Sequence, residues 1–152
     1  MSVTRAPKGH PSPCGPERPR VHGTPRLALG RQGEDVAAAH LTRLGYRVLA
    51  RNARTRQGEI DLIVAGHGSL VFVEVKTRRC SVAARARGAP AIEPLAALRP
   101  RQRVRLRRLA AAWMADGGVP RPAAREIRFD AVGVVIDATG RLARLDHVEA
   151  AW

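Results

Sequence analysis

The sequence predicts an α/β domain in which helices and strands follow one another in the order α-β-β-β-α-β-β. Segments 27–44 and 99–116 carry apolar residues at the spacing that places them on one face of a helix. Five shorter segments are alternating or continuously apolar, as strands are: 46–50, 58–65, 70–77, 126–136 and 142–148. The chain of 152 residues is long enough for one domain with its own core, and no internal repeat divides it.

The first helix is predicted to pack through a face that includes an acid. Its i, i+3, i+4 and i+7 positions are Glu34, Ala37, Ala38 and Leu41. Gly45 follows where a left-handed C-terminal cap belongs. Glu34 is therefore expected on, or at the edge of, the side of the helix that faces the core.

The second and third strands are predicted to form an antiparallel hairpin around the glycine-rich segment 66–69. We predict that Val64 pairs with Val71, which leaves a six-residue loop. In this register Asp61 lies opposite Glu74, and directly opposed residues have Cβ atoms roughly 4.5–5.5 Å apart. A slip of one residue would move Asp61 to the other face and surround the acids with valines, which is less favourable.

The segments between these elements are predicted to be turns and one long loop. Residues 52–57 are predicted to form a basic turn, and residues 137–141 to form a turn as well. Segment 78–98 has no clear period and contains one glycine and two prolines. We predict that it is a mobile loop, long enough to serve a function.

The composition favours a polyanionic partner. The formal net charge is +14 and the isoelectric point is about 11.7, which is typical of proteins that bind nucleic acid. A GC-rich genome, which enriches Arg, Ala, Gly and Pro together, is an alternative explanation for part of this charge.

Residues 1–26 hold six prolines and five Lys or Arg against one acid. They are predicted to form a disordered basic arm before a folded domain, 27–152. We favour a dispensable extension over a phosphate-binding role for this arm.

Several classes of protein are not indicated by the sequence. Cys14 and Cys80 do not form a close pair, so we expect neither a zinc knuckle nor a disulfide framework. No apolar run reaches the roughly 18 residues of a membrane span. The basic N-terminus is not followed by the apolar segment of a secretory signal. We therefore expect a cytoplasmic protein, with association with the nucleoid as an open alternative.

The strongest functional pattern is the convergence of two acids and a lysine on neighbouring strands. Two carboxylates as close as Asp61 and Glu74 repel each other unless a cation lies between them or one is protonated. Oxygen ligands suit Mg²⁺ or Mn²⁺, and these strands contain no histidine that would favour zinc. Lys76 could position or activate a water, or neutralise charge on a phosphate. Glu34 could complete the metal's ligands directly or through water.

The competing interpretation is a solvated hairpin face with cross-strand salt bridges, which is the usual role of such residues. Two features argue against it: the strands are otherwise apolar on both faces, and Glu34 adds a third acid from the first helix. In the predicted register Glu59 lies opposite Lys76. It is either a partner of that lysine or a solvated residue at the end of the strand, and both alternatives remain open.

The pattern D-x(12)-E-V-K, preceded by a glutamate on a helix, resembles the PD-(D/E)xK nuclease superfamily, with Ile60 in place of the proline. More closely, GRQGEDVAAAHLTRLGYRVLARNARTRQGEIDLIV and LVFVEVKTR resemble the YraN family of bacterial proteins, which is similar in fold to archaeal Holliday-junction resolvases. The resemblance extends from about residue 27 to the C-terminus and is strongest over 30–78. It implies a restriction-endonuclease-like core, with a mixed central sheet of about five strands flanked by helices.

The resemblance also implies roles for individual residues. Asp61, Glu74, Glu34 and the backbone carbonyl of Val75 would hold Mg²⁺ or Mn²⁺, and Lys76 would be the catalytic lysine. Relatives commonly carry lysine near the start of the second helix, where this chain has Arg101-Gln102-Arg103. Arginine can hold phosphate there, but it cannot act as a base.

Arginine-rich segments flank the predicted metal site along the chain. Residues 76–108 contain eleven Lys or Arg and one acid, and the arginines of 43–56 form another acid-free run. Predicted nucleic-acid contacts are Arg54, Arg56, Arg78, Arg79, Arg101, Gln102 and Arg103. The alternative is a solvated arginine-rich surface. No zinc-finger spacing, helix-turn-helix or aromatic set is present to recognise bases, so binding should depend on the phosphate backbone and on shape.

The leading hypothesis is a Mg²⁺-dependent endonuclease that acts on branched or structured DNA. Two alternatives are a nucleic-acid-binding protein that keeps the nuclease fold without cleaving, and an adaptor that docks on DNA- or RNA-processing proteins. Resolvases act as symmetric dimers because two strands must be cut. A homodimer is therefore part of the leading hypothesis, although no sequence feature identifies its interface.

Overall fold

The computed structural model describes residues 24–81, 93–117 and 123–152. The elements follow along the chain as α1 (Pro25–Arg43), β1 (Arg47–Thr55), β2 (Gly58–Gly66), β3 (Ser69–Arg79), the 3-10 helix η1 (Pro94–Ala97), α3 (Pro100–Ala115), β4 (Glu126–Ile136) and β5 (Leu142–Val148). Apart from the added η1, this is the order predicted from the sequence. Residues 1–23 of the predicted arm lie outside the described residues, and α1 begins at Pro25, inside that arm. No helix in the described part of the chain is long and apolar enough to cross a membrane.

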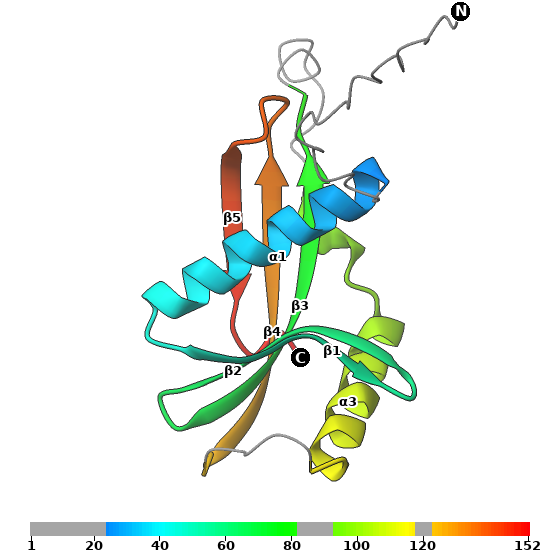
Figure 1. Cartoon of the computed structure of the whole chain (residues 1–152), viewed down its shortest axis with the longest axis vertical. Coiled ribbons are helices and arrows are strands. Elements are labelled where there is room, and N and C mark those ends of the chain that lie inside the picture. The colour runs from blue at the N-terminus through cyan, green and yellow to red at the C-terminus, as the bar shows by residue number, and fades with distance from the viewer. Residues whose placement is uncertain (1–23, 82–92, 118–122) are drawn as a thin grey trace, which may run out of the picture.

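The strands form a single mixed sheet in the order β1-β2-β3-β4-β5. Strands β3 and β4 are parallel and pair along their whole length, from Ser69↔Glu126 to Arg79↔Ile136. The other neighbours are antiparallel. Parallel neighbours need a crossover connection, and α3 lies in the one between β3 and β4 (Figure 1).

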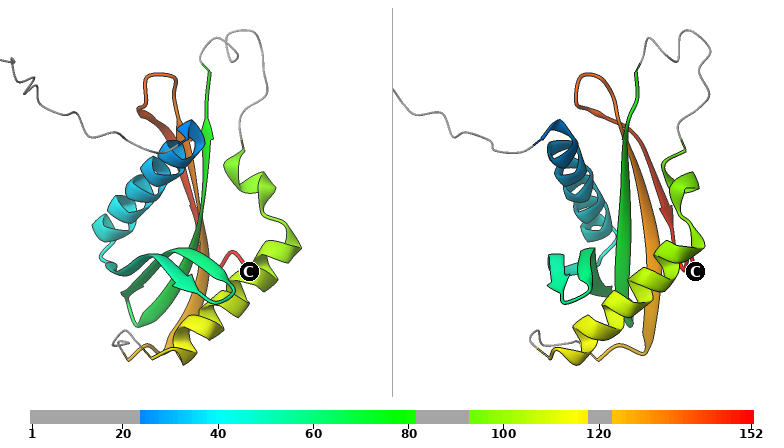
Figure 2. Two further views of the ribbon diagram at one scale, coloured as in Figure 1. Left: turned by 45° about the vertical axis from the view of Figure 1, so that its right-hand side comes forward. Right: turned by 90° about the vertical axis from the view of Figure 1, so that its right-hand side faces the viewer.

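Each face of the sheet carries its own hydrophobic core, so the domain has three layers (Figure 2). On one face Ala37, Ala38 and Leu41 of α1 pack against valines of β2, β3 and β4. On the other face Leu106, Leu109 and Ala110 of α3 pack against β2 and β3. The predicted inward faces of both helices are therefore confirmed.

The hairpin between β2 and β3 has the predicted register, because Val64 pairs with Val71. Its loop is shorter than the predicted six residues, since Gly66 also pairs with Ser69. Only His67 and Gly68 connect the strands, and both have positive φ angles, 53° and 80°. This is the geometry of a two-residue hairpin turn that matches the twist of the sheet.

The predicted basic turn at 52–57 is confined to residues 56–57, because β1 continues to Thr55. Its pairing with β2 extends to Thr55↔Gly58, whereas β2 pairs with β3 only from Leu62 to Gly66. Before Leu62, the β1–β2 ribbon therefore leaves the sheet, and it packs against α3 (Figure 1). Residues 53–55 form strand here because they pair with β2, as Ala53↔Ile60, Arg54↔Glu59 and Thr55↔Gly58.

The predicted loop 78–98 is shortened at both ends. Residues 78 and 79 belong to β3, and residues 94–97 form η1. A Cβ at Gly133 of β4 would lie 2.6 Å from Pro94 and 3.0 Å from Leu95, so this glycine allows η1 to lie directly on β4. Residues 82–92 of the predicted mobile loop lie outside the described residues.

Candidate functional site

The predicted metal site lies where β2 separates from β3. The last paired residues are Leu62 and Val73, and Asp61 is the next residue on β2. The Asp61 carboxylate accepts a hydrogen bond of 2.7 Å from the backbone N–H of Val75. A side chain thus takes the place of strand pairing at this point, and the bond holds Asp61 beside Glu74.

Glu74 and Lys76 form a second pair within the same group. Glu74 is only 6% exposed although it carries a carboxylate. The Nζ of Lys76 donates a hydrogen bond to Oε1 of Glu74. Glu74 and Lys76 are two residues apart on β3, so alternation places them on the same side of the strand.

Helix α1 brings Glu34 to the same region because Gly33 allows a close approach. A Cβ at Gly33 would overlap the Thr77 hydroxyl of β3. Without that Cβ, α1 lies directly against β3 at the level of the site. The Glu34 carboxylate accepts a hydrogen bond of 2.9 Å from Asn52 of β1, a residue with a positive φ of 47°.

All four predicted catalytic residues line one pocket of about 240 Å³: Glu34, Asp61, Glu74 and Lys76. Val75 and Arg78, which were also predicted, line it as well. Sequence reasoning missed Arg26, which was assigned to the arm but contributes to this pocket from the first turn of α1. Pro25, which favours a helix start, was a signal for the earlier helix boundary.

The electrostatics of the pocket favour a cation. Burial, together with the nearby Glu74 and Glu34 carboxylates, raises the pKa of Asp61 to about 7. The hydrogen bond from Val75 and the charge of Lys76 act in the opposite direction. Holding the negative charge on Asp61 at neutral pH is therefore costly, and a cation would relieve that cost.

The donors suit a hydrated Mg²⁺ better than a metal held wholly by side chains. In the described part of the chain, no group of three His, Cys, Asp or Glu side chains is placed to hold a metal. Asp61 and Glu74 provide two carboxylates. The N–H and C=O of one residue point to the same edge of a strand, so the Val75 carbonyl faces the edge that β2 leaves open. Mg²⁺ commonly binds through one or two carboxylates and keeps several waters.

The structure favours the solvated interpretation of Glu59. Its carboxylate lies 3.7 Å from Arg54, its neighbour on β1, while Lys76 bonds to Glu74 instead. Arg56 is exposed beside Arg54 at the tip of the ribbon, and Arg79 is exposed at the end of β3. Arg54 and Arg56 therefore belong to the ribbon, whereas Arg78 and Arg79 border the pocket end of β3.

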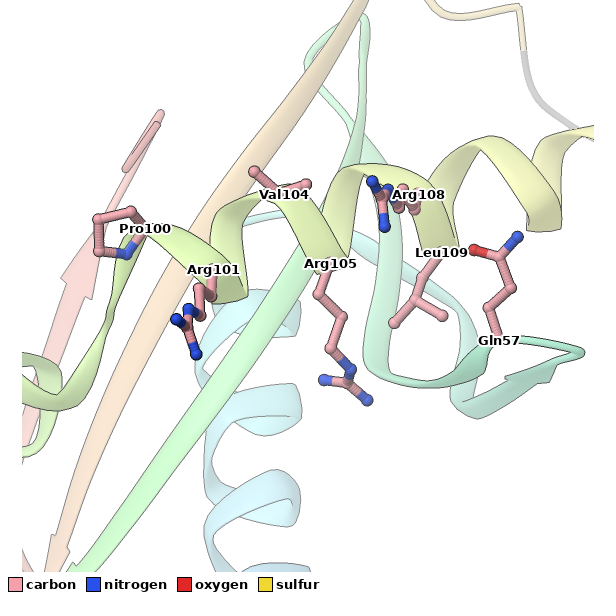
Figure 3. A pocket seen from close by; sticks show the side chains of 7 residues that line it. All are labelled: Gln57, Pro100, Arg101, Val104, Arg105, Arg108 and Leu109. Carbon is pink, nitrogen blue, oxygen red and sulfur yellow. The ribbon is translucent and has the colours of Figure 1, made fainter.

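The three predicted contacts at the start of α3 have different environments. The Gln102 side chain accepts a hydrogen bond of 3.1 Å from the backbone N–H of Arg99 and so caps the helix. The guanidinium of Arg103 lies 5.8 Å from the ring centroid of Trp152. Only Arg101 lines a second pocket, of about 540 Å³, between α3 and the tip of the β1–β2 ribbon (Figure 3).

A buried polar network on β4, made of residues that do not line the acidic pocket, was also missed. Asp130 of β4 is fully buried and bonds to Arg128, to His147 and to the backbone of Ala150. The other ring nitrogen of His147 lies 3.3 Å from His40 of α1. These two histidines are 107 residues apart in the sequence and meet only in the fold. They tie the end of α1 to β5.

Comparison with known proteins places the chain in a family without assigning an activity. The model described as "Uncharacterised protein family UPF0102" matches residues 33–134, which include the acidic pocket from Glu34 to Lys76 and all of α3. Three relatives named UPF0102 proteins come from Streptomyces griseus subsp. griseus, Frankia casuarinae and Symbiobacterium thermophilum. Their sequences are 45%, 44% and 48% identical to this chain. These matches cover 76%, 82% and 75% of this chain and 88%, 96% and 87% of the relatives. The chain therefore belongs to UPF0102, the YraN family that its sequence resembles.

Proposed function

We propose that this protein is a divalent-metal-dependent endonuclease of the PD-(D/E)xK type that cleaves branched or structured DNA. The observation that carries the proposal is the acidic pocket itself. It gathers Asp61, Glu74 and Lys76 at the separation of two strands, with Glu34 on the adjoining helix. The pKa of Asp61, raised to about 7, marks a group whose charge needs a counter-ion.

Each residue of the pocket has a role in this proposal. Asp61, Glu74 and the Val75 carbonyl would hold Mg²⁺ or Mn²⁺, with Glu34 contributing through water. When bound, the metal would supply an activated water and stabilisation of charge on the phosphate. Lys76, which donates to Glu74, has its Nζ within reach of the same ligands, where it orients the attacking water or donates to a phosphate oxygen. The Val75 N–H keeps the Asp61 carboxylate oriented.

The preference for DNA rests on the resemblance to resolvases and on charge. The formal net charge of +14 favours a polyanion, and Arg26 and Arg78 line the acidic pocket itself. Cleavage of both strands at a junction would require two active sites, so the proposal includes a homodimer, acting in the cytoplasm where the DNA lies.

The second candidate is a nucleic-acid-binding protein that does not cleave. It is favoured by one observation: within the described residues no third side-chain ligand joins Asp61 and Glu74, because Glu34 is bonded to Asn52. In this alternative the basic surface would bind nucleic acid, and the acids would take no part in chemistry.

Cleavage of labelled four-way junction, flap, duplex and single-stranded DNA with Mg²⁺ or Mn²⁺ tests the proposal. Asp61→Asn keeps an acceptor for the Val75 N–H but removes the charge. We expect it to lower cleavage by at least about 100-fold, because a metal ligand is lost. Each tenfold step corresponds to a loss of roughly 1.4 kcal/mol of transition-state stabilisation, so two such steps are expected. Asp35→Asn is the matched control, because Asp35 is an exposed acid on the same helix as Glu34. Unchanged cleavage by Asp61→Asn would refute this mechanism, and binding without cleavage by the wild type would support the second candidate.

A further inference from the structure

We propose that the pocket between α3 and the tip of the β1–β2 ribbon binds an unpaired nucleotide of the substrate strand. This inference rests on the proposed action on DNA and specifies the substrate class: branches with a single-stranded segment. The pocket of about 540 Å³ has the size of a small-molecule site. It lies apart from the acidic pocket, with no lining residue in common.

The charged part of the pocket is a row of arginines on one helix face. Arg101, Arg105 and Arg108 follow the i, i+4, i+7 spacing, and all three line the pocket. In Figure 3 Arg101 and Arg105 extend from the same side of α3, and Gln57 projects from the ribbon tip towards the helix.

These arginines lack acidic partners among the residues that the structure describes. The contact of Arg105 is a hydrogen bond of 3.5 Å to the backbone carbonyl of Glu59. The neighbouring arginines of α3 differ, since Arg103 lies over Trp152 and Arg107 lies 5.7 Å from the ring centroid of Phe129. Like charges one helix turn apart repel each other, and a phosphate between them would relieve that repulsion.

Apart from Gln57, the rest of the pocket is apolar, which a site for phosphate alone would not need. Val104 lies between the arginines and is 52% exposed, and Pro100 is also exposed. Leu109 forms the inner wall. An apolar surface beside guanidinium groups suits a base and its phosphate, because an unpaired base can lie against both. A base within a duplex is stacked and paired, so it cannot enter.

A groove on the β1–β2 ribbon connects the pocket at α3 with the proposed cleavage site. A groove of about 720 Å³ runs between α1 and the β1–β2 ribbon, lined by Asn52, Arg54 and Glu59 among others. It shares Arg26, Gly30 and Glu34 with the acidic pocket. At its other side, Glu59 accepts the hydrogen bond from Arg105. A single strand held at α3 could therefore follow the ribbon to the acids.

Binding without metal tests this inference independently of cleavage. The probes are a short labelled oligothymidylate, a flap and a blunt duplex, measured by fluorescence anisotropy in EDTA. We expect Arg101→Ala/Arg105→Ala to weaken binding of the single strand and the flap at least about tenfold, or roughly 1.4 kcal/mol, because it removes cation contacts to the phosphate and the base. Binding of the duplex should weaken much less.

Arg103→Ala/Arg107→Ala is the matched control, since it removes the same charge from the same helix outside the pocket. If both double variants weaken all three DNAs alike, the effect is general electrostatics and the pocket proposal is wrong. Val104→Asn tests the apolar part at an exposed position, where it should not affect folding and changes no charge beside the arginines. We expect it to weaken binding of the single strand, and an unchanged affinity would overturn the proposal. Competition by inorganic phosphate as effective as that by the oligonucleotide would also overturn it, by indicating a simple anion site. None of these results depends on whether Asp61→Asn abolishes cleavage.

Discussion

At the scale of single residues, Asp61 carries a charge that this fold stabilises poorly. Its pKa in the folded protein is about 7, against 3.8 for the free group. The folded state therefore binds this proton more tightly than the unfolded state does. The contribution of this proton to the free energy of unfolding is fully present below about pH 4. It is lost as the pH rises through 7.

Because the pKa of Asp61 is raised, we predict that Asp61→Asn stabilises the metal-free protein, and that the stabilisation depends on pH. Asparagine cannot ionise, so the free energy of unfolding should rise at pH 8 by up to roughly 4 kcal/mol, at about 1.4 kcal/mol per pKa unit. At pH 4 the two proteins should differ little. Chemical denaturation at both pH values in EDTA measures the effect, with Asp35→Asn as the exposed control. The same stabilisation at both pH values would show that charge on Asp61 is not the cause.

The same residue links stability to metal. A cation that binds only the folded protein raises its stability according to its concentration and affinity. At pH 8 we therefore expect Mg²⁺ or Mn²⁺ to raise the melting temperature of the wild type and to have a much smaller effect on Asp61→Asn. An equal rise in both proteins would place the metal elsewhere. No rise in either would favour the non-catalytic candidate.

At the scale of elements, the site depends on how closely α1 lies to β3. Gly33→Ala would place a Cβ on the Thr77 hydroxyl, and overpacking of this kind costs about 1–3 kcal/mol. We expect lower stability and weaker cleavage, because α1 carries Glu34. Gly30→Ala, three residues earlier, meets nothing within 4 Å. It should be neutral or stabilising, since alanine is the better helix former. Thermal melts compare the two variants, and Thr77→Ala should partly rescue Gly33→Ala. Equal effects at Gly30 and Gly33 would mean that helix propensity, not contact with β3, is responsible.

Local pattern predicted the elements well where alternation or helical spacing was strong. The pairing of Val64 with Val71 was confirmed, because apolar alternation on both strands leaves one favourable register. The strand at 52–55 was missed because its residues are polar and take their conformation from pairing with β2. The division of α3 into pocket-lining and ring-stacked arginines was also missed, because it depends on where Trp152 and Phe129 lie. The contact of His40 with His147 was missed because it depends on how α1 and β5 lie in the fold, and not on any local pattern.

At the scale of the whole molecule, the formal net charge of +14 has opposite effects on folding and on binding. Self-repulsion of like charges destabilises the compact state and is screened by salt. Contacts with phosphate, in contrast, release counter-ions and weaken as salt rises. If about six phosphates are contacted, the affinity for DNA should fall about 1,000-fold between roughly 50 and 200 mM salt.

We therefore expect added NaCl to raise the melting temperature slightly while it strongly weakens binding of duplex DNA, both measured in EDTA. The slope of the logarithm of affinity against the logarithm of salt concentration contains roughly 0.9 for each neutralised phosphate. The control double variant on α3, Arg103→Ala/Arg107→Ala, should therefore reduce this slope by the equivalent of at most about two phosphates. The pocket variant Val104→Asn should preserve most of the slope while it lowers affinity for a single strand, since it changes no charge. Affinity for duplex that does not change with salt would contradict binding through the phosphate backbone. It would leave the excess of arginine to be explained by genome composition alone.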